Sequence, residues 1–274
     1  MNVLQNLIAL LNHLSPDSTY RNVCAGILEN LEEAAEGTIY DIAEMTNCSR
    51  TTVWRMVQKM GYRSFSDFHY ELKQAVRKYT HYNRILPAEK CTSSEAIRDV
   101  LLDQTASACE AIKNSVDMDL LNKLTDEIYQ ADKVSFYAPF HSSSIFSFQQ
   151  NLAMVGLETG YYCLMPEMLE DSRTLTESSI VFANTIDHAE TMDLTEVFEN
   201  ARKCGAKIFG IQSGKSKYED YLECDLVNDA AGGVLKGTVI FDIYFYLLSE
   251  IYRMKYINLS LIHISEPTRR RGIS

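Results

Sequence analysis

The sequence predicts an α + α/β protein, in which an all-α helix-turn-helix bundle precedes a three-layer α/β domain with a parallel sheet. Within residues 37–62, two short amphipathic segments flank a tight turn. From about residue 134, short apolar runs alternate with amphipathic segments, which is typical of parallel strands connected by helices. The 274 residues, of which 46% are hydrophobic, suffice for two ordinary domains.

Residues 37–62 predict the helix-turn-helix. The apolar positions of its first helix are Ile39, Ile42, Ala43 and Met45, and those of its second helix are Val53, Met56, Val57 and Met60. Asn47-Cys48 interrupts the periodicity as a turn, and Ser49 stands where a helix N-cap is expected. Gly61 is expected to end the second helix in a left-handed conformation.

The polar face of the second helix suits the major groove of DNA. Arginine can pair bidentately with guanine, threonine can meet the thymine methyl group, and lysine or glutamine can contact phosphates. We assign base reading to Arg50, Thr51, Thr52 and Arg55, and backbone contact to Ser49, Gln58, Lys59 and Arg63. The alternative is an ordinary amphipathic helix with a solvated charged face.

Charge is unevenly distributed along the chain. The net charge is −11 and the pI is about 5.1. Between residues 38 and 78 the bases are Arg50, Arg55, Lys59, Arg63, Lys73, Arg77 and Lys78, and the acids are Asp41, Glu44, Asp67 and Glu71. This local surplus favours phosphate binding, and the acidic remainder would limit non-specific association with DNA.

The cysteines and the terminal segments indicate a cytoplasmic protein without cofactors or metals. Seven cysteines are scattered with no C-x-x-C pair, which favours reduced thiols. The N-terminus lacks the features of a signal peptide. Asp242 interrupts the longest apolar run, 239–248, so no membrane span is expected.

The remaining elements follow from periodicity and breakers. Helices are expected at 3–14, 18–35, from Ser64 or Ser66 to Val76, and at 93–114, 119–130, 144–156, 191–203 and 237–256, with a short one near 217–222. Strands are expected at 134–138, 160–164, 179–184, 206–211 and 224–227. The predicted division is a helix-turn-helix domain at 1–78, a linker at 79–92, an α/β domain at 93–259 and a tail at 260–274.

The tail matches no element of this pattern. It resembles translated sequencing-adaptor sequence, so we expect it to be non-native and assign it no function. A basic tail that contacts DNA is the alternative.

The segment 38–68 resembles the N-terminal domain of RpiR/MurR-type transcriptional regulators. The matching residues are Ile42-Ala43, Ser49, Thr52-Val53, Arg55, Lys59, Gly61-Tyr62 and Phe65. Residues 120–256 are similar to the sugar-isomerase (SIS) domain with which that family senses phosphosugars. The resemblance implies a homodimer or homotetramer that binds double-stranded operator DNA under the control of a small-molecule effector.

The phosphate loops of that family are altered in this chain. The first family motif, G-x-G-x-S, is matched by residues 138–142, where both glycines are missing and Ser142 remains. The second, S-x-S-G-x-T, is matched by residues 183–188, which place Ile186 at the glycine and Asp187 beside it. The candidate effector-binding residues are His141, Ser142, Ser143, Ser144, Thr185, His188 and Glu190. A plain helix cap at Ser142–Ser144 is the alternative reading.

The resemblance favours a transcriptional regulator of carbohydrate metabolism with no catalytic residues. One alternative is a sugar-phosphate isomerase, for which Glu190 and His188 would be the acid–base pair. The other is a ligand-blind domain that dimerises and carries the DNA-binding domain.

Overall fold

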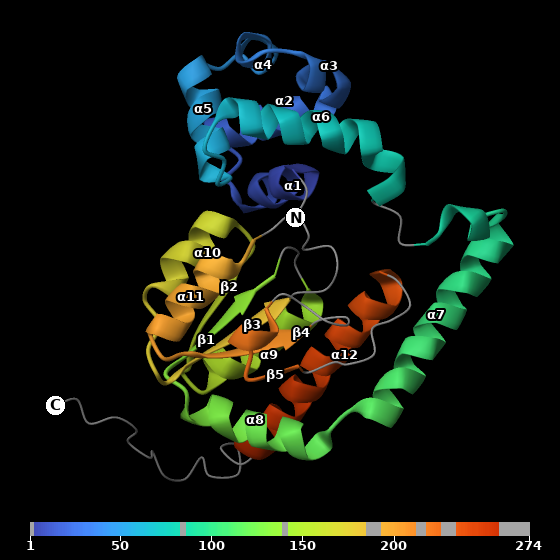
Figure 1. Cartoon of the computed structure of the whole chain (residues 1–274), viewed down its shortest axis with the longest axis vertical. Coiled ribbons are helices and arrows are strands. Elements are labelled where there is room, and N and C mark those ends of the chain that lie inside the picture. The colour runs from blue at the N-terminus through green and yellow to red at the C-terminus, as the bar shows by residue number, and fades with distance from the viewer. Residues whose placement is uncertain are drawn as a thin grey trace.

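The structure is a computed structural model that describes residues 3–82, 86–138, 142–184, 193–211, 218–225 and 234–257. It consists of a helical domain and an α/β domain, as the sequence predicts (Figure 1). Helix α1 lies on the side of the helical domain that faces the α/β domain, and α4 lies on the opposite side (Figure 1). Among the described residues, no helix combines the length and apolarity needed to cross a bilayer.

The helical domain is built around one apolar core. Its helices are α1 (Val3–His13), α2 (Thr19–Glu29), α3 (Leu31–Glu36), α4 (Ile39–Met45), α5 (Arg50–Lys59) and α6 (Phe65–Tyr82). The buried faces of these helices include four residues with no exposed surface, Leu7, Ile27, Val57 and Phe68. Because each helix is short, its stability depends on this packed face more than on helix propensity.

Three expectations for this region need correction. The helix expected at 18–35 is two helices, because the backbone of Asn30 leaves the helical region at φ −131° and ψ 48°. The helix expected to end at Val76 continues to Tyr82, since no helix breaker follows Val76. Residues 79–82 of the predicted linker are therefore helical, and a 3₁₀ turn, η1 (Ala88–Lys90), lies within its second half.

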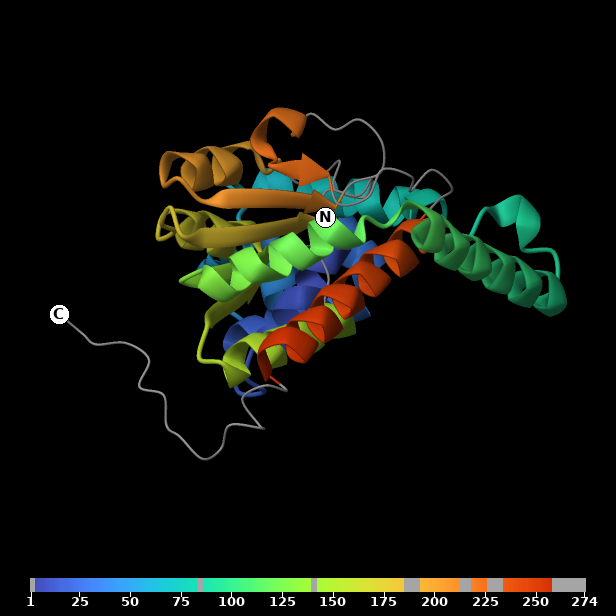
Figure 2. The ribbon, with the colours of Figure 1, turned by 90° about the horizontal axis from the view of Figure 1, so that it is seen from below.

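The α/β domain begins with two capped helices. Ser93 accepts a hydrogen bond from Ala96 N and caps α7 (Ser94–Ser115), and Asp117 does the same for α8 (Met118–Gln130) through Leu120 N. Both views show α7 extending away from the body (Figure 1, Figure 2). Its C-terminal half packs on α12 through buried Ala108 and Ile112.

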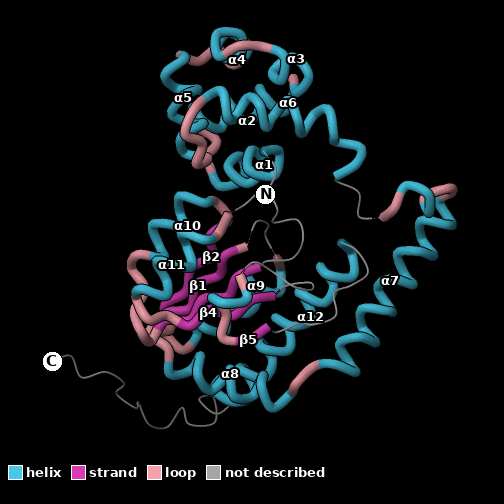
Figure 3. The backbone as a smooth tube through the Cα atoms, viewed as in Figure 1, coloured by secondary structure: helices cyan, strands magenta, loops and turns pink. Residues whose placement is uncertain are grey.

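The sheet is parallel, with the strand order β2-β1-β3-β4-β5. The strands of the sheet are the magenta segments of Figure 3. Its strands are β1 (Lys133–Tyr137), β2 (Glu158–Tyr162), β3 (Ser179–Asn184), β4 (Lys207–Ile211) and β5 (Cys224–Asp225). Val134 pairs with Ile180, and Val181 pairs with Ile208. Strand β2 begins two residues earlier than expected.

Helices cover both faces of the sheet, which gives the three layers predicted. On one face lie α8, α9 (Ser143–Met154) and α12 (Val234–Tyr252). A π-helical segment, η4 (Arg253–Ile257), follows α12. On the other face lie α10 (Met165–Ser172) and α11 (Thr195–Lys203). The core of the first face is aromatic, with the rings of Phe136 and Phe182 stacked at 5.5 Å. A 3₁₀ turn, η3 (Glu219–Tyr221), precedes β5.

Helix α10 has no counterpart among the expected elements. It starts directly after β2, with Pro166 in its first turn, where a missing N–H leaves no hydrogen bond unmade. With eight residues, the helix is too short to show a clear period in the sequence.

The two domains touch where α5 ends. Gly61 follows α5 with φ +92°, and a Cβ atom at this glycine would lie 3.2 Å from Pro166 Cδ. The end of the second helix of the helix-turn-helix therefore abuts the start of α10.

Candidate nucleic-acid interface and effector site

The helix-turn-helix is held by a cap at the start of each helix. In α4, Thr38 accepts hydrogen bonds from Tyr40 N and Asp41 N, and Asp41 accepts one from Thr38 N. In α5, Ser49 Oγ accepts from Thr52 N at 3.1 Å. Asn47 turns the chain between them with φ +50°, a conformation that asparagine tolerates better than most residues. The predicted turn and N-cap are both confirmed.

The face of α5 predicted to read DNA is exposed. The side chains of Ser49, Arg50, Thr51, Arg55, Gln58, Lys59 and Arg63 are exposed, and that of Thr52 is half-buried. The opposite face buries Val53, Met56 and Val57. Trp54, which the sequence places off the apolar stripe, packs partly against the core. The hydroxyls of Ser49 and Thr52 lie 2.9 Å apart, so both already contribute to the cap.

Within residues 38–77, the unpaired positive charge lies on α5 and at Arg63. Within the described part of the chain, Arg55, Lys59 and Arg63 form no ion pair. Lys73 and Arg77, which belong to the same local surplus in the sequence, both pair with Glu36 on α3. The hydrogen bond from Lys73 lowers the pKa of Glu36.

Tyr40 is a residue of this surface that the sequence analysis missed. It lies in the first turn of α4, and the guanidinium carbon of Arg50 lies 4.4 Å from its ring centroid. A cation over an aromatic face at this distance is attracted by the ring quadrupole. The signal available in the sequence was an aromatic residue on the polar side of the first helix.

The candidate effector site lies where β1 ends and α9 begins. Ser142 and Ser144 both donate hydrogen bonds of 2.6 Å to Asp242 Oδ1 of α12, and their hydroxyl oxygens lie 2.5 Å apart. Ser142 N donates to Tyr161 Oη at 3.0 Å, and Ser143 Oγ lies 3.0 Å from Tyr246 Oη. Ser142 also caps α9 through Ile145 N.

This geometry makes the hydroxyls of Ser142 and Ser144 less able to donate hydrogen bonds to a phosphate, because both already donate to Asp242. Ser144 has no exposed surface, and the proton of Ser142 is directed to a carboxylate rather than to an open pocket. A phosphate that took the Ser142 proton would have to displace Asp242 and would be repelled by its charge. His141, Thr185, His188 and Glu190 lie outside the described residues, so their placement stays a prediction.

A second buried polar network lies on the opposite face of the sheet. Asp171 of α10 accepts hydrogen bonds of 2.7 Å from Lys133 Nζ and from Tyr137 Oη, both of β1. Burial alone would raise the pKa of Asp171. The hydrogen bonds that Lys133 and the hydroxyl groups around Asp171 donate outweigh the effect of burial, so the pKa of Asp171 is lowered. Burial and the nearby carboxylate raise the pKa of Tyr137. This network joins α10 to the sheet.

Among the residues that the structure describes, no group of three or more histidine, cysteine, aspartate or glutamate side chains is arranged to hold a metal ion.

Comparison with known proteins supports both domains. Residues 1–79 match the family described as "Helix-turn-helix domain, rpiR family". The HTH-type transcriptional regulator HexR of Escherichia coli K12 is 28% identical over 146 residues, 53% of this chain and 49% of that protein. HexR of Pseudomonas aeruginosa is 23% identical over 221 residues, 78% of this chain and 74% of that protein. The chain thus spans about half the length of the first of these relatives.

Solved structures support the fold of the whole chain. The Vibrio vulnificus NanR protein complexed with ManNAc-6P aligns with a TM-score of 0.50 at 19% identity, covering 98% of this chain and 100% of that one. The sugar isomerase domain of the RpiR transcription factor from Sphaerobacter thermophilus aligns with a TM-score of 0.50 at 11% identity, covering 62% and 96%. The chain therefore carries a helix-turn-helix domain of the rpiR family, followed by an α/β domain with the fold of a sugar isomerase domain.

Proposed function

We propose that this protein is a sequence-specific DNA-binding transcriptional regulator of carbohydrate metabolism. The observation that carries the proposal is the exposed face of α5, where Arg50, Arg55 and Lys59 project from a helix that follows a tight turn. The first turn of such a helix reaches base edges, and cations further along hold phosphates. The similarity of the chain to the HexR regulators supports the same function.

The protein acts as a homodimer or homotetramer in the cytoplasm. Two copies of α5, placed one helical turn of DNA apart, about 34 Å, would read the two halves of a palindromic operator. The exposed Arg50, Thr51 and Arg55, together with half-buried Thr52, read bases. Ser49, Gln58, Lys59 and Arg63 contact the backbone.

A sugar-phosphate-like effector binds the α/β domain and controls DNA binding. The NanR structure is a complex with ManNAc-6P, which gives the chemical class of ligand to test first. The effector site comprises Ser142, Ser143 and Ser144 with His141, Thr185, His188 and Glu190. Asp242 beside Ser142 makes this site less favourable for a phosphate dianion than one with free serine donors. We propose no enzymatic activity, since the HexR relatives are described as transcriptional regulators.

The DNA-binding proposal is tested by selecting duplexes from a randomised pool with the full-length protein. Binding of the selected duplex is then measured against salt concentration for wild type and for Arg55→Ala and Lys59→Ala. Arg55→Ala should weaken binding to the selected duplex by roughly five- to 150-fold, the discrimination that one bidentate base contact supplies. Lys59→Ala should weaken binding to all duplexes and reduce the salt slope by about one unit.

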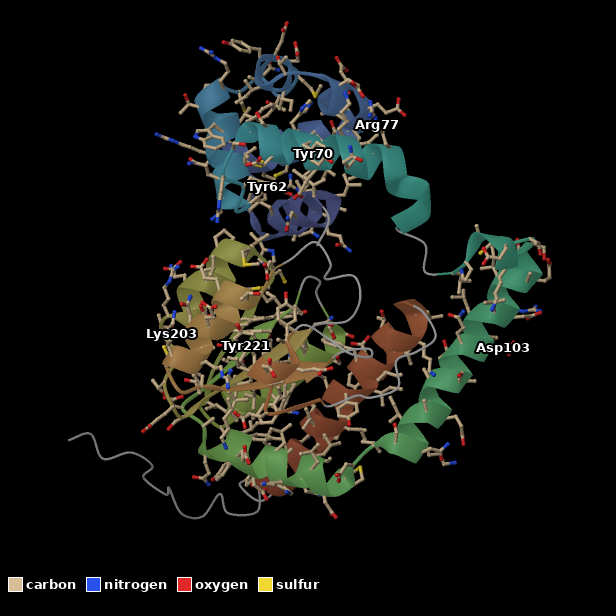
Figure 4. The ribbon with its side chains drawn as sticks, in the orientation of Figure 1. Tyr62, Tyr70, Arg77, Asp103, Lys203 and Tyr221 are labelled. Atoms are coloured by element: carbon tan, nitrogen blue, oxygen red, sulfur yellow. The ribbon has the colours of Figure 1, made fainter. Side chains whose placement is uncertain are left out.

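Lys203 of α11 provides the matched control, because it is an exposed lysine outside the helical domain (Figure 4). Lys203→Ala should leave affinity and salt slope unchanged. If Lys59→Ala leaves the affinity and the salt slope as unchanged as Lys203→Ala does, the face of α5 does not contact DNA.

A further inference from the structure

The side chain of Tyr40 is exposed in a domain that buries most of its large apolar groups. It is 61% exposed, and its ring lies against the guanidinium of Arg50. The contact joins the two helices of the helix-turn-helix across their solvent side, opposite to the core that Ile42 and Val53 share. The ring therefore contributes little to the core, and its contact is with the guanidinium of Arg50.

Both ends of this contact are anchored in rigid backbone. Tyr40 follows Thr38, whose capping box with Asp41 fixes the first turn of α4. Arg50 is the first residue of α5, directly after the Ser49 cap. Since both residues lie beside capped helix starts, the distance between their backbones is set, and the arginine side chain is the mobile part. Placing its guanidinium over the ring removes much of that freedom before DNA arrives.

We propose that Tyr40 is a positioning residue for sequence readout, which holds the Arg50 guanidinium in the orientation from which it pairs with guanine. This inference rests on the proposed DNA-binding function. Arg50 occupies the start of α5, the part of such a helix that reaches base edges. The guanidinium carbon lies over the Tyr40 ring, and a guanidinium that stacks by its face on a ring keeps its N–H donors for a bidentate pair with guanine. Tyr40 thus raises the preference for a guanine-containing site and leaves phosphate binding unaffected.

The test uses the full-length protein, the selected duplex, and a duplex of equal length with the selected bases scrambled. Tyr40→Leu removes the aromatic face and keeps an apolar side chain, so it should weaken binding to the selected duplex by roughly two- to five-fold. Binding to the scrambled duplex should not change. Tyr40→Phe retains the ring and should bind both duplexes like wild type. Tyr70→Leu is the matched control, because Tyr70 is a 65% exposed tyrosine on α6 (Figure 4).

A double-mutant cycle separates positioning from direct contact with DNA. If Tyr40 acts through Arg50, Tyr40→Leu adds no further loss in the Arg50→Ala background. Additive losses, or an equal loss on both duplexes, would overturn the inference. A loss in Tyr40→Phe as large as in Tyr40→Leu would also overturn it, because it would assign the effect to a phenol–phosphate contact. If Arg50→Ala weakens binding and Tyr40→Leu does not, only this inference fails. If the wild type selects no duplex, the proposed function fails and the inference fails with it.

Discussion

Replacing Asp171 with asparagine should destabilise the α/β domain by about 3 kcal/mol. The Asp171 carboxylate is buried and accepts 2.7 Å hydrogen bonds from Lys133 and Tyr137. Removing one partner of a buried ion pair costs about 3–5 kcal/mol. The lower end applies here, because Lys133 keeps a second carboxylate, Glu158, at 3.3 Å. The amide of asparagine keeps the shape of the side chain but removes the charge that compensates the ammonium group.

Glu158→Gln is the matched control for this prediction. Glu158 contacts the same lysine, but its side chain is 70% exposed, so its loss should cost about 0.5 kcal/mol or less. Urea unfolding followed by far-UV circular dichroism measures both free energies. The fluorescence of Trp54, the single tryptophan, reports separately on the helical domain. A loss below about 1 kcal/mol for Asp171→Asn, or one equal to that of Glu158→Gln, would refute the reasoning.

The pH dependence follows from the lowered pKa of Asp171. The stabilisation it provides is present above the usual aspartate value of 3.8 and is lost as the pH falls through the lower folded-state pKa. The difference in free energy of unfolding between wild type and Asp171→Asn should therefore narrow below pH 3.8. An unchanged difference across that range would show that folding does not lower the pKa of Asp171.

Three further predictions concern other parts of the molecule. Gly61→Ala should lower the melting temperature more than Gly156→Ala, because both glycines have positive φ but only the first meets a neighbour at 3.2 Å; equal shifts in thermal unfolding would contradict this. Asp242→Asn should strengthen binding of sugar phosphates roughly five-fold or more by removing a like charge, and calorimetry that finds weaker binding would exclude the proposed repulsion. Exposed Cys109 should react with maleimide in the native protein while Cys24 does not, because burial raises the pKa of the Cys24 thiol to about 12. Mass spectrometry of the labelled peptides measures this, and equal labelling of the two cysteines would contradict the prediction.

Local signals sufficed for the helix-turn-helix and for the class of the second domain. The cap at Ser49, the turn at Asn47 and the stop at Gly61 each depend on one or two residues whose conformational preferences are strong. The strand at Ser179–Asn184 has the expected bounds, because all its residues are buried and turn residues flank it. The domain boundaries at 1–78 and 93–259 stay predictions.

The contacts at the sites are long-range and leave little trace in sequence. Asp242 stands out in the sequence only as a charge that interrupts an apolar helix, and its partner Ser142 is 100 positions away. Asp171 lies in a helix too short to be recognised, and its partner Lys133 lies 38 positions earlier. A charge within an apolar stretch predicts a partner, but only the fold identifies it.

The contact between Gly61 and Pro166 has a consequence for communication within the chain. The end of α5 lies against the first turn of α10, which follows β2. Strand β1 pairs in parallel with β2, and its carboxyl end leads to the candidate effector site at the same edge of the sheet. A ligand that displaces this strand end together with the start of α10 would therefore perturb α5 or separate the two domains. Because such coupling is reciprocal, DNA bound to α5 would alter ligand affinity by the same factor by which the ligand alters DNA affinity.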